Sequence, residues 1–207
     1  TTGNVVDPIA VIDEWGIDAF RYYMLRELDI GPDGNWTNGG FQTRYAAELA
    51  NGIGNLVNRS LSMLNRYRQG AVPAICNELE TEVNEASKEV IELSRSHKLQ
   101  GALRRIWELI ARINQYIDQT APFKLAKDPE QSERLGEILY TLVESCRVIA
   151  VLLNPYLPGT SQKIYDQLCL EDKPDLFMKS AWGGMKADHV VGKPQPLFPR
   201  KDLPPKK

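Results

Sequence analysis

The chain has 207 residues, of which 43% are hydrophobic and 25% charged, and its formal net charge is −2. This composition excludes a largely disordered chain, because apolar content is ordinary and the net charge is small. A chain of this length also needs neither disulfides nor a metal to bury a core. Its longest apolar run, residues 148–153, is far shorter than the ~18 residues of a membrane-spanning helix, so no membrane partner is expected.

Cysteine and histidine are too sparse to predict a metal site or a cysteine nucleophile. Cys76, Cys146 and Cys169 stand far apart, with neither a Cys-x-x-Cys pair nor zinc-ligand spacing, and His97 and His189 are the only histidines. Isolated thiols of this kind are typical of a reducing, cytoplasmic location. The chain starts at a threonine with no basic leader, and we interpret it as a piece from within a larger protein.

The first 40 residues predict short elements of mixed type. Asp7 followed by Pro8 is a typical N-cap and first residue of a helix, and Asp18 can begin a second helix through residue 27. Residues 32–35 predict a turn, and Trp36 with Thr37 a brief strand. Residues 1–40 are therefore expected to form a small mixed α/β region.

From residue 41 onward the pattern changes to long amphipathic helices. Apolar residues recur every three or four positions over 41–69, 78–96, 98–119 and 130–153, and a short fifth helix follows Pro158. Connections of about five to ten residues favour antiparallel neighbours. We predict an all-α fold with an antiparallel helical bundle of about five helices at residues 41–170. The Pro- and Lys-rich residues 171–207 predict an extended C-terminal segment and linker.

Charge is uneven along the predicted bundle. Residues 41–70 carry four Arg and one Glu, residues 98–127 six basic and two acidic side chains, and residues 78–92 six Glu and one Lys. On charge alone the pattern favours a solubilising polar surface, and the alternative is a cationic face that follows an RNA backbone within a neutral molecule.

The sequence contains no recognisable catalytic motif. A phosphate-binding glycine loop, a nucleophile elbow and a Ser–His pair at motif spacing are all missing from it. We therefore predict no catalytic residue in this chain.

A row of polar residues on the first long helix is a candidate binding face. Asn51, Asn55, Arg59, Ser62 and Arg66 follow at steps of four, four, three and four, so they share one side of the helix. Asn offers a donor and an acceptor together, and Arg offers a fixed fork of donors, so the pair can read base edges. The same spacing is compatible with a merely solvated face.

A loop aromatic is the second candidate. Phe123 follows Pro122 between two predicted helices, and Lys124 and Lys127 flank it. An aromatic ring beside cations can stack on an unpaired base, which is worth ~1–3 kcal/mol. The ring could equally cap the core beneath the loop.

Taken together, these features resemble the methionyl-tRNA synthetase family of class I aminoacyl-tRNA synthetases. The resemblance runs from the end of the KMSKS catalytic loop, where Thr1 stands in place of the final Ser, to the end of the anticodon-binding domain. It rests on matching segments in the right order, namely residues 1–8, 15–23 with 33–37, 48–59, 121–127 and 196–200.

The resemblance implies roles for four residues. In the family, the positions of Asn55 and Arg59 contact the CAU anticodon, and the loop aromatic at Phe123, next to Pro122, stacks on the first anticodon base. The family usually has Trp there, and a phenyl ring covers less of a base, so weaker stacking is expected. Ala46 also departs from the family, which commonly has Asn at that position.

The resemblance further implies a parent enzyme that attaches methionine to tRNA in the cytoplasm. It would use ATP and Mg²⁺ in a catalytic domain upstream of Thr1, so this chain alone should be inactive and hold no cofactor. The implied partners are the methionine-specific tRNA and that catalytic domain. Two alternatives remain, the bundle of another class I synthetase and a helical interaction scaffold with no RNA role.

Overall fold

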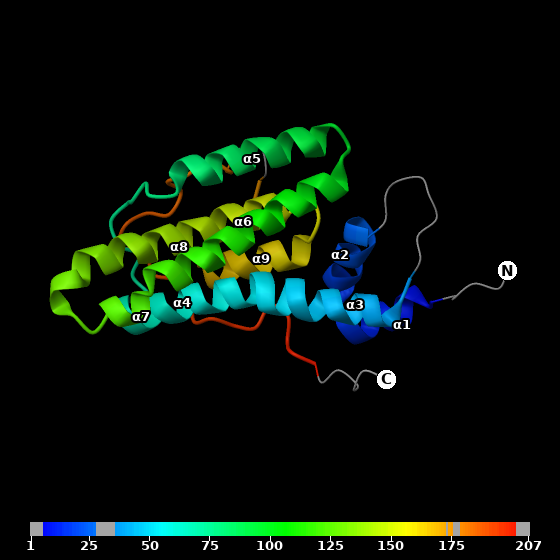
Figure 1. Ribbon diagram of the computed structural model, residues 1–207, viewed down its shortest axis with the longest axis horizontal. Coiled ribbons are helices and arrows are strands. Elements are labelled where there is room, and N and C mark those ends of the chain that lie inside the picture. The colour runs from blue at the N-terminus through cyan, green and yellow to red at the C-terminus, as the bar shows by residue number, and fades with distance from the viewer. Residues whose placement is uncertain (1–5, 28–35, 173, 176–178, 202–207) are drawn as a thin grey trace.

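The computed structural model describes residues 6–27, 36–172, 174–175 and 179–201, and Figure 1 shows that they form a bundle of long helices with shorter helices at one end. The elements are α1 (Pro8–Trp15), α2 (Ile17–Glu27), α3 (Asn38–Arg44), the π-helix η1 (Tyr45–Gly54), α4 (Asn55–Arg68), α5 (Glu80–Arg95), α6 (Leu99–Thr120), α7 (Pro122–Leu125), the 3₁₀ turn η2 (Pro129–Gln131), α8 (Ser132–Leu153) and α9 (Pro158–Gln167). Consecutive long helices run antiparallel, so the predicted all-α bundle is confirmed.

The described part of the N-terminal region forms helices and no strand, so the mixed α/β expectation is wrong there. Asp7 caps α1 as predicted, and its Oδ1 accepts a hydrogen bond from the Ile9 amide at 2.9 Å. The expected strand at Trp36 and Thr37 does not form, because Thr37 is the N-cap of α3 and accepts from the Gly40 amide at 3.1 Å. The turn predicted at residues 32–35 lies outside the described residues.

The first long helix is continuous from α3 through η1 to α4, with a π-helical middle. Through α3 and η1 its buried residues follow at steps of four, namely Phe41, Tyr45, Leu49 and Ile53, whereas α4 returns to α-helical spacing with Leu56, Val57, Ser60, Leu61 and Leu64. On an α-helix each such step overshoots a full turn by about 40°, so the stripe would wind around the axis. The wider π turns reverse this drift. The π-helix therefore keeps the stripe on the core.

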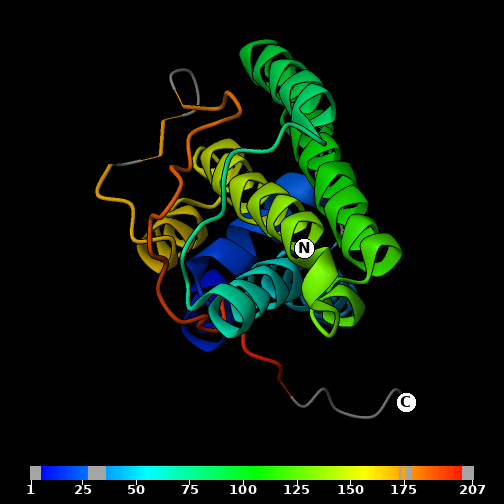
Figure 2. The same cartoon turned by 90° about the vertical axis from the view of Figure 1, so that its left-hand side faces the viewer.

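Helix α8 occupies the centre of the bundle, packed against α4, α5, α6, α7 and α9, and Figure 2 shows it surrounded by other helices. It is buried on all sides along most of its length, as expected for a helix that is apolar all round. Two charged residues are buried within it, Glu144 and Arg147, whose ion pair is 2.6 Å long.

The C-terminal segment returns along the bundle as an extended strap, residues 179–201. It begins on the buried pair, where Glu144 accepts from the Met185 amide at 2.8 Å, and it forms an antiparallel bridge between Val190 and Ala71. It ends under η1, where Pro199 accepts a 2.9 Å bond from the Tyr45 hydroxyl. Figure 1 shows the first part of this segment in orange near α5 and α8, and its later part in red along the lower side of α4. The predicted extended ending is thus fastened to the bundle over its described residues.

The buried core is continuous from α2 to the strap, with Tyr22, Leu168 and Leu197 among its members. The division of the chain at residues 40 and 170 stays a prediction. Among the described residues, no helix is both long and apolar enough to cross a membrane.

Candidate nucleic-acid interface

A surface groove of about 470 Å³ separates the first long helix from α6. One wall comes from η1 and α4 and the other from α6, which lie side by side in Figure 1. The lining residues are Ala47, Glu48, Asn51, Gly52, Asn55, Arg59, Trp107, Ile110, Ala111, Asn114, Gln115 and Asp118. Three of the five polar residues predicted to share a helix face therefore line this groove, and Asn55 and Arg59 are among them.

Arg59 bridges the two walls of the groove. Its Nη2 donates to Asp118 Oδ1 at 2.6 Å, close to the C-terminal end of α6. The Arg59 side chain is 31% exposed and that of Asp118 67%. Within the described residues, the other two guanidinium nitrogens of Arg59 form no hydrogen bond. The ion pair therefore fixes the direction of the fork and leaves donors facing the groove.

Asn55 lies one helical turn before Arg59 and is half-buried. Its side-chain amide makes no hydrogen bond to any part of the chain that the structure describes. Both the NH2 donor and the carbonyl acceptor of that side chain are therefore open to the groove. Asn51, one turn further back, accepts a 3.2 Å bond from Arg200 of the strap. The strap thus reaches the far end of the same row of polar residues.

Two side chains of α6 hold the π-helical wall from inside the groove. Trp107 Nε1 donates to the carbonyl of Glu48 at 3.1 Å, and Asn114 Nδ2 donates to the carbonyl of Gly52 at 3.4 Å. Tyr22 of α2 packs against the Trp107 ring and donates its hydroxyl to the Glu48 carboxylate. Burial, together with that carboxylate, raises the pKa of Tyr22, so the phenol stays a donor.

Phe123 and Pro122 lie at the end of the groove but do not line it. Ala121 ends α6 in the left-handed conformation, with φ 43°, and Pro122 starts the single turn α7. Pro122 is buried, whereas Phe123 is 47% exposed. The buried proline therefore sets the direction of the turn, and half of the aromatic ring is left on the surface five residues beyond Asp118.

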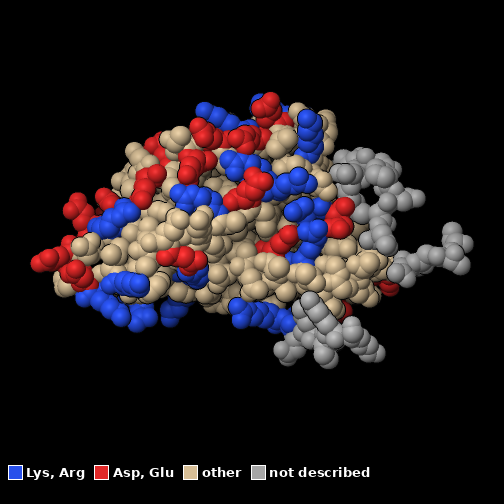
Figure 3. All heavy atoms as spheres, in the orientation of Figure 1, with Lys and Arg blue, Asp and Glu red and all other residues tan. Residues whose placement is uncertain are grey.

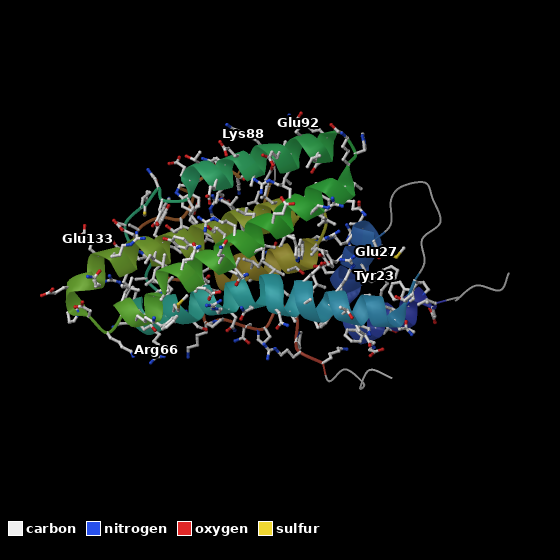
Figure 4. The ribbon with its side chains drawn as sticks, viewed as in Figure 1. Tyr23, Glu27, Arg66, Lys88, Glu92 and Glu133 are labelled. Atoms are coloured by element: carbon white, nitrogen blue, oxygen red, sulfur yellow. The ribbon has the colours of Figure 1, made fainter. Side chains whose placement is uncertain are left out.

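Unpaired cations surround this end of the bundle. Arg66, Lys124 and Lys127 form no ion pair within the described residues, and the Arg66 guanidinium lies over the Tyr67 ring, 5.7 Å from its centroid. Figure 4 shows Arg66 on the lower side of the bundle, close to α7, and Figure 3 shows basic side chains gathered along this lower edge. The lower edge of the bundle beside α7 is therefore cationic, whereas acidic side chains such as Glu133 lie above it at the same end.

The sequence did not single out the α6 wall. Trp107, Asn114 and Asp118 follow at steps of seven and four, beside the apolar seam of the same helix, so a shared face could have been recognised. What the pattern cannot give is which helix that face meets. The joint position of Asn55, Arg59 and Asp118 needed the packing of α4 against α6.

Comparison with known families agrees with this arrangement. Residues 77–193 match the family model described as "Anticodon-binding domain of tRNA ligase", and residues 1–61 match the model for "tRNA synthetases class I (M)". The first match covers more than half of the chain. The chain belongs to the family of anticodon-binding domains of tRNA ligases.

The similar proteins specify the kind of ligase. The chain is 42% identical to a methionine–tRNA ligase of Bacillus subtilis, over 96% of this chain and 31% of that protein. It is 39% identical to the methionine–tRNA ligase of Lactococcus lactis, over 97% of this chain and 31% of that protein. The apo crystal structure of Mycobacterium tuberculosis methionyl-tRNA synthetase superimposes with a TM-score of 0.85 at 30% identity, covering 97% of this chain and 42% of that one.

These findings confirm the resemblance to methionyl-tRNA synthetases and favour it over the bundle of another synthetase or an RNA-independent scaffold. The chain spans about a third of the length of the curated relatives that it matches. The roles of Asn55, Arg59, Pro122 and Phe123 stay predictions.

Proposed function

We propose that this chain recognises the CAU anticodon of methionine-specific tRNA as part of a cytoplasmic methionine–tRNA ligase. The whole protein would attach methionine to that tRNA with ATP and Mg²⁺ in an upstream catalytic domain. Thr1, which would close the KMSKS motif, lies outside the described residues, so no step of the chemistry is assigned to this chain. Its contribution is binding energy and specificity.

The observation that carries the proposal is the groove in which Asn55 and Arg59 face α6. An anticodon presents unpaired bases, whose edges require donors and acceptors in fixed directions. The open amide of Asn55 offers both, and Arg59, already directed by Asp118, loses little freedom when a base binds. Two such groups one helical turn apart can contact neighbouring bases of one loop.

The end of the bundle supplies the remaining parts of an RNA-loop site. The exposed face of Phe123 can stack on a base that leaves the loop. The unpaired cations Arg66, Lys124 and Lys127 can lie against its phosphates, a contribution that weakens as salt rises. Base reading and phosphate binding are thereby assigned to different side chains, which makes them separable by experiment.

The test is a titration of the chain with tRNA carrying CAU and with tRNAs in which one anticodon base at a time is changed, at two salt concentrations. We expect CAU to be preferred, and Arg59→Ala to lower the preference by about 1–3 kcal/mol, the usual value of one base contact. The Arg59→Ala variant should leave the salt dependence almost unchanged.

Arg105→Ala is the matched control. Arg105 also pairs with an exposed carboxylate, that of Glu89, and its side chain is 26% exposed against 31% for Arg59, but it faces α5 instead of the groove. The control should keep the full preference for CAU. Equal binding of all anticodons by the unmodified chain, falling together with salt, would mean that only phosphates are bound and would refute the proposal.

A further inference from the structure

The π-helix η1 carries part of the groove wall, and its register is fixed from α6. Trp107 donates to the Glu48 carbonyl at 3.1 Å and Asn114 to the Gly52 carbonyl at 3.4 Å. The two carbonyls are four residues apart along η1. Both of these residues and both donors line the groove. The side chains of α6 thus contact the backbone of η1 at two successive positions along the groove.

The register matters because it determines where the polar side chains point. A residue in a π-helix advances by roughly 80° around the axis, against about 100° in an α-helix. Over the ten residues of η1 the difference amounts to roughly half a turn. A change to α-helical geometry would therefore rotate Asn51 and Asn55 relative to the start of the helix.

A π-helix of this length needs support from its surroundings, because such segments are rare and are usually single turns. Part of the support is the buried stripe at steps of four. The remainder lies at the groove, where Trp107 stacks on Tyr22 with ring centroids 4.3 Å apart and Tyr22 bonds the Glu48 carboxylate. Arg44 holds the same carboxylate at 3.0 Å, one turn earlier on the helix.

We propose that Trp107 and Asn114 are positioning residues for anticodon recognition, acting through the π-helical register of η1 and not through contact with the RNA. By holding the carbonyls of Glu48 and Gly52, they direct the amides of Asn51 and Asn55 into the groove. The proposal rests on the proposed function and adds two residues to it.

The experiment removes one donor and keeps the ring. Trp107→Phe abolishes the bond to Glu48 but retains an aromatic surface against Tyr22. Trp182→Phe is its matched control, because Trp182 Nε1 also donates to a backbone carbonyl, that of Cys76 at 2.9 Å, and does not line the groove. We expect Trp107→Phe to lower the preference for CAU over single-base variants about tenfold, the scale of one misplaced base contact, and Trp182→Phe to leave it unchanged.

A second pair tests the other end of η1. Asn114→Ala should lower the preference in the same way, whereas Asn65→Ala, which also removes amide bonds to two carbonyls, should not. In a chain that already carries Asn55→Ala, Trp107→Phe should cause much less further loss, because it acts through that amide. Amide hydrogen exchange of residues 49–54 should be faster in Trp107→Phe.

The outcomes separate the two proposals. If the unmodified chain shows no preference for CAU, the proposed function fails, and this inference fails with it. If the preference exists but Trp107→Phe and Asn114→Ala retain it as the controls do, the positioning role is refuted and the proposed function stands. Unchanged hydrogen exchange in η1 would equally overturn the register argument.

Discussion

Replacing Arg147 by alanine tests how the strap is held on the bundle. Both carboxylate oxygens of Glu144 accept from the Arg147 guanidinium, at 2.6 Å and 3.0 Å, and the Glu144 side chain is 0% exposed. The same carboxylate accepts from three successive amides of the strap, at 2.8 Å, 3.0 Å and 2.8 Å. Arg147 in turn donates to two strap carbonyls, those of Lys179 and Ala181.

The magnitude follows from what the truncation leaves behind. Arg147→Ala leaves the buried Glu144 carboxylate without its cation, and breaking one side of a buried pair costs about 3–5 kcal/mol. The three strap amides still solvate Glu144, which places the expected loss near the lower end, at about 3 kcal/mol. This is a large share of a typical stability of about 5–15 kcal/mol. The surface pair removed by Arg105→Ala should cost no more than about 1 kcal/mol.

The assay is urea unfolding followed by circular dichroism, with hydrogen exchange of residues 179–185 as the local readout. Adding Glu144→Gln to Arg147→Ala should recover part of the loss, because the charge is removed while the amide oxygen can still accept from the Gly183 and Gly184 amides, although the bond from the Met185 amide is lost. An Arg147→Ala chain as stable as Arg105→Ala would refute the reasoning. So would a double variant less stable than the single one.

Two further predictions concern protonation. Hydrogen bonds from Arg134 hold the pKa of Glu78 below its ordinary value. The stability that Glu78 contributes is therefore present above its unfolded-state pKa, near 4.5, and is lost as pH falls through the lower folded-state value. The difference in unfolding free energy between the unmodified chain and Glu78→Gln should close in acid, and a difference that stays constant from pH 7 to pH 3 would contradict this. Burial raises the pKa of the Cys146 thiol to about 12. A disulfide reagent at pH 8 should therefore label the exposed Cys169 in the folded chain and reach Cys146 only on unfolding. If Cys146 and Cys169 were labelled at the same rate in the folded chain, the buried position of Cys146 would be contradicted.

The helices and their inward faces were predictable, because apolar periodicity and turn residues are local signals. The predicted ranges 78–96 and 98–119 agree with α5 and α6 to within a few residues. The π-helix also has a local signal, the step of four from Phe41 through Tyr45 and Leu49 to Ile53. Such a step cannot stay on one side of an α-helix, so it indicates wider turns.

The groove and the buried pair were not predictable in this way. Glu144 and Arg147 are three residues apart on α8, a spacing that is equally common for pairs on exposed helix faces. Their burial depends on the strap, which begins more than 30 residues later in the chain. The site likewise requires α4 and α6 to meet at Arg59 and Asp118, a contact between residues 59 positions apart.

The two regions that match different family models form one packed unit. Asp18 on α2 accepts from the Thr160 hydroxyl at 2.7 Å, at the N-terminus of α9, and Arg21 donates to the Tyr156 carbonyl at 2.7 Å, just after α8. A carboxylate at the start of one helix and a guanidinium near the end of another complement both helix dipoles. Because α2 also supports Trp107 through Tyr22, the same short helix contacts the α8–α9 corner and the wall of the groove. The residues preceding the bundle are therefore part of the scaffold that shapes the candidate anticodon site.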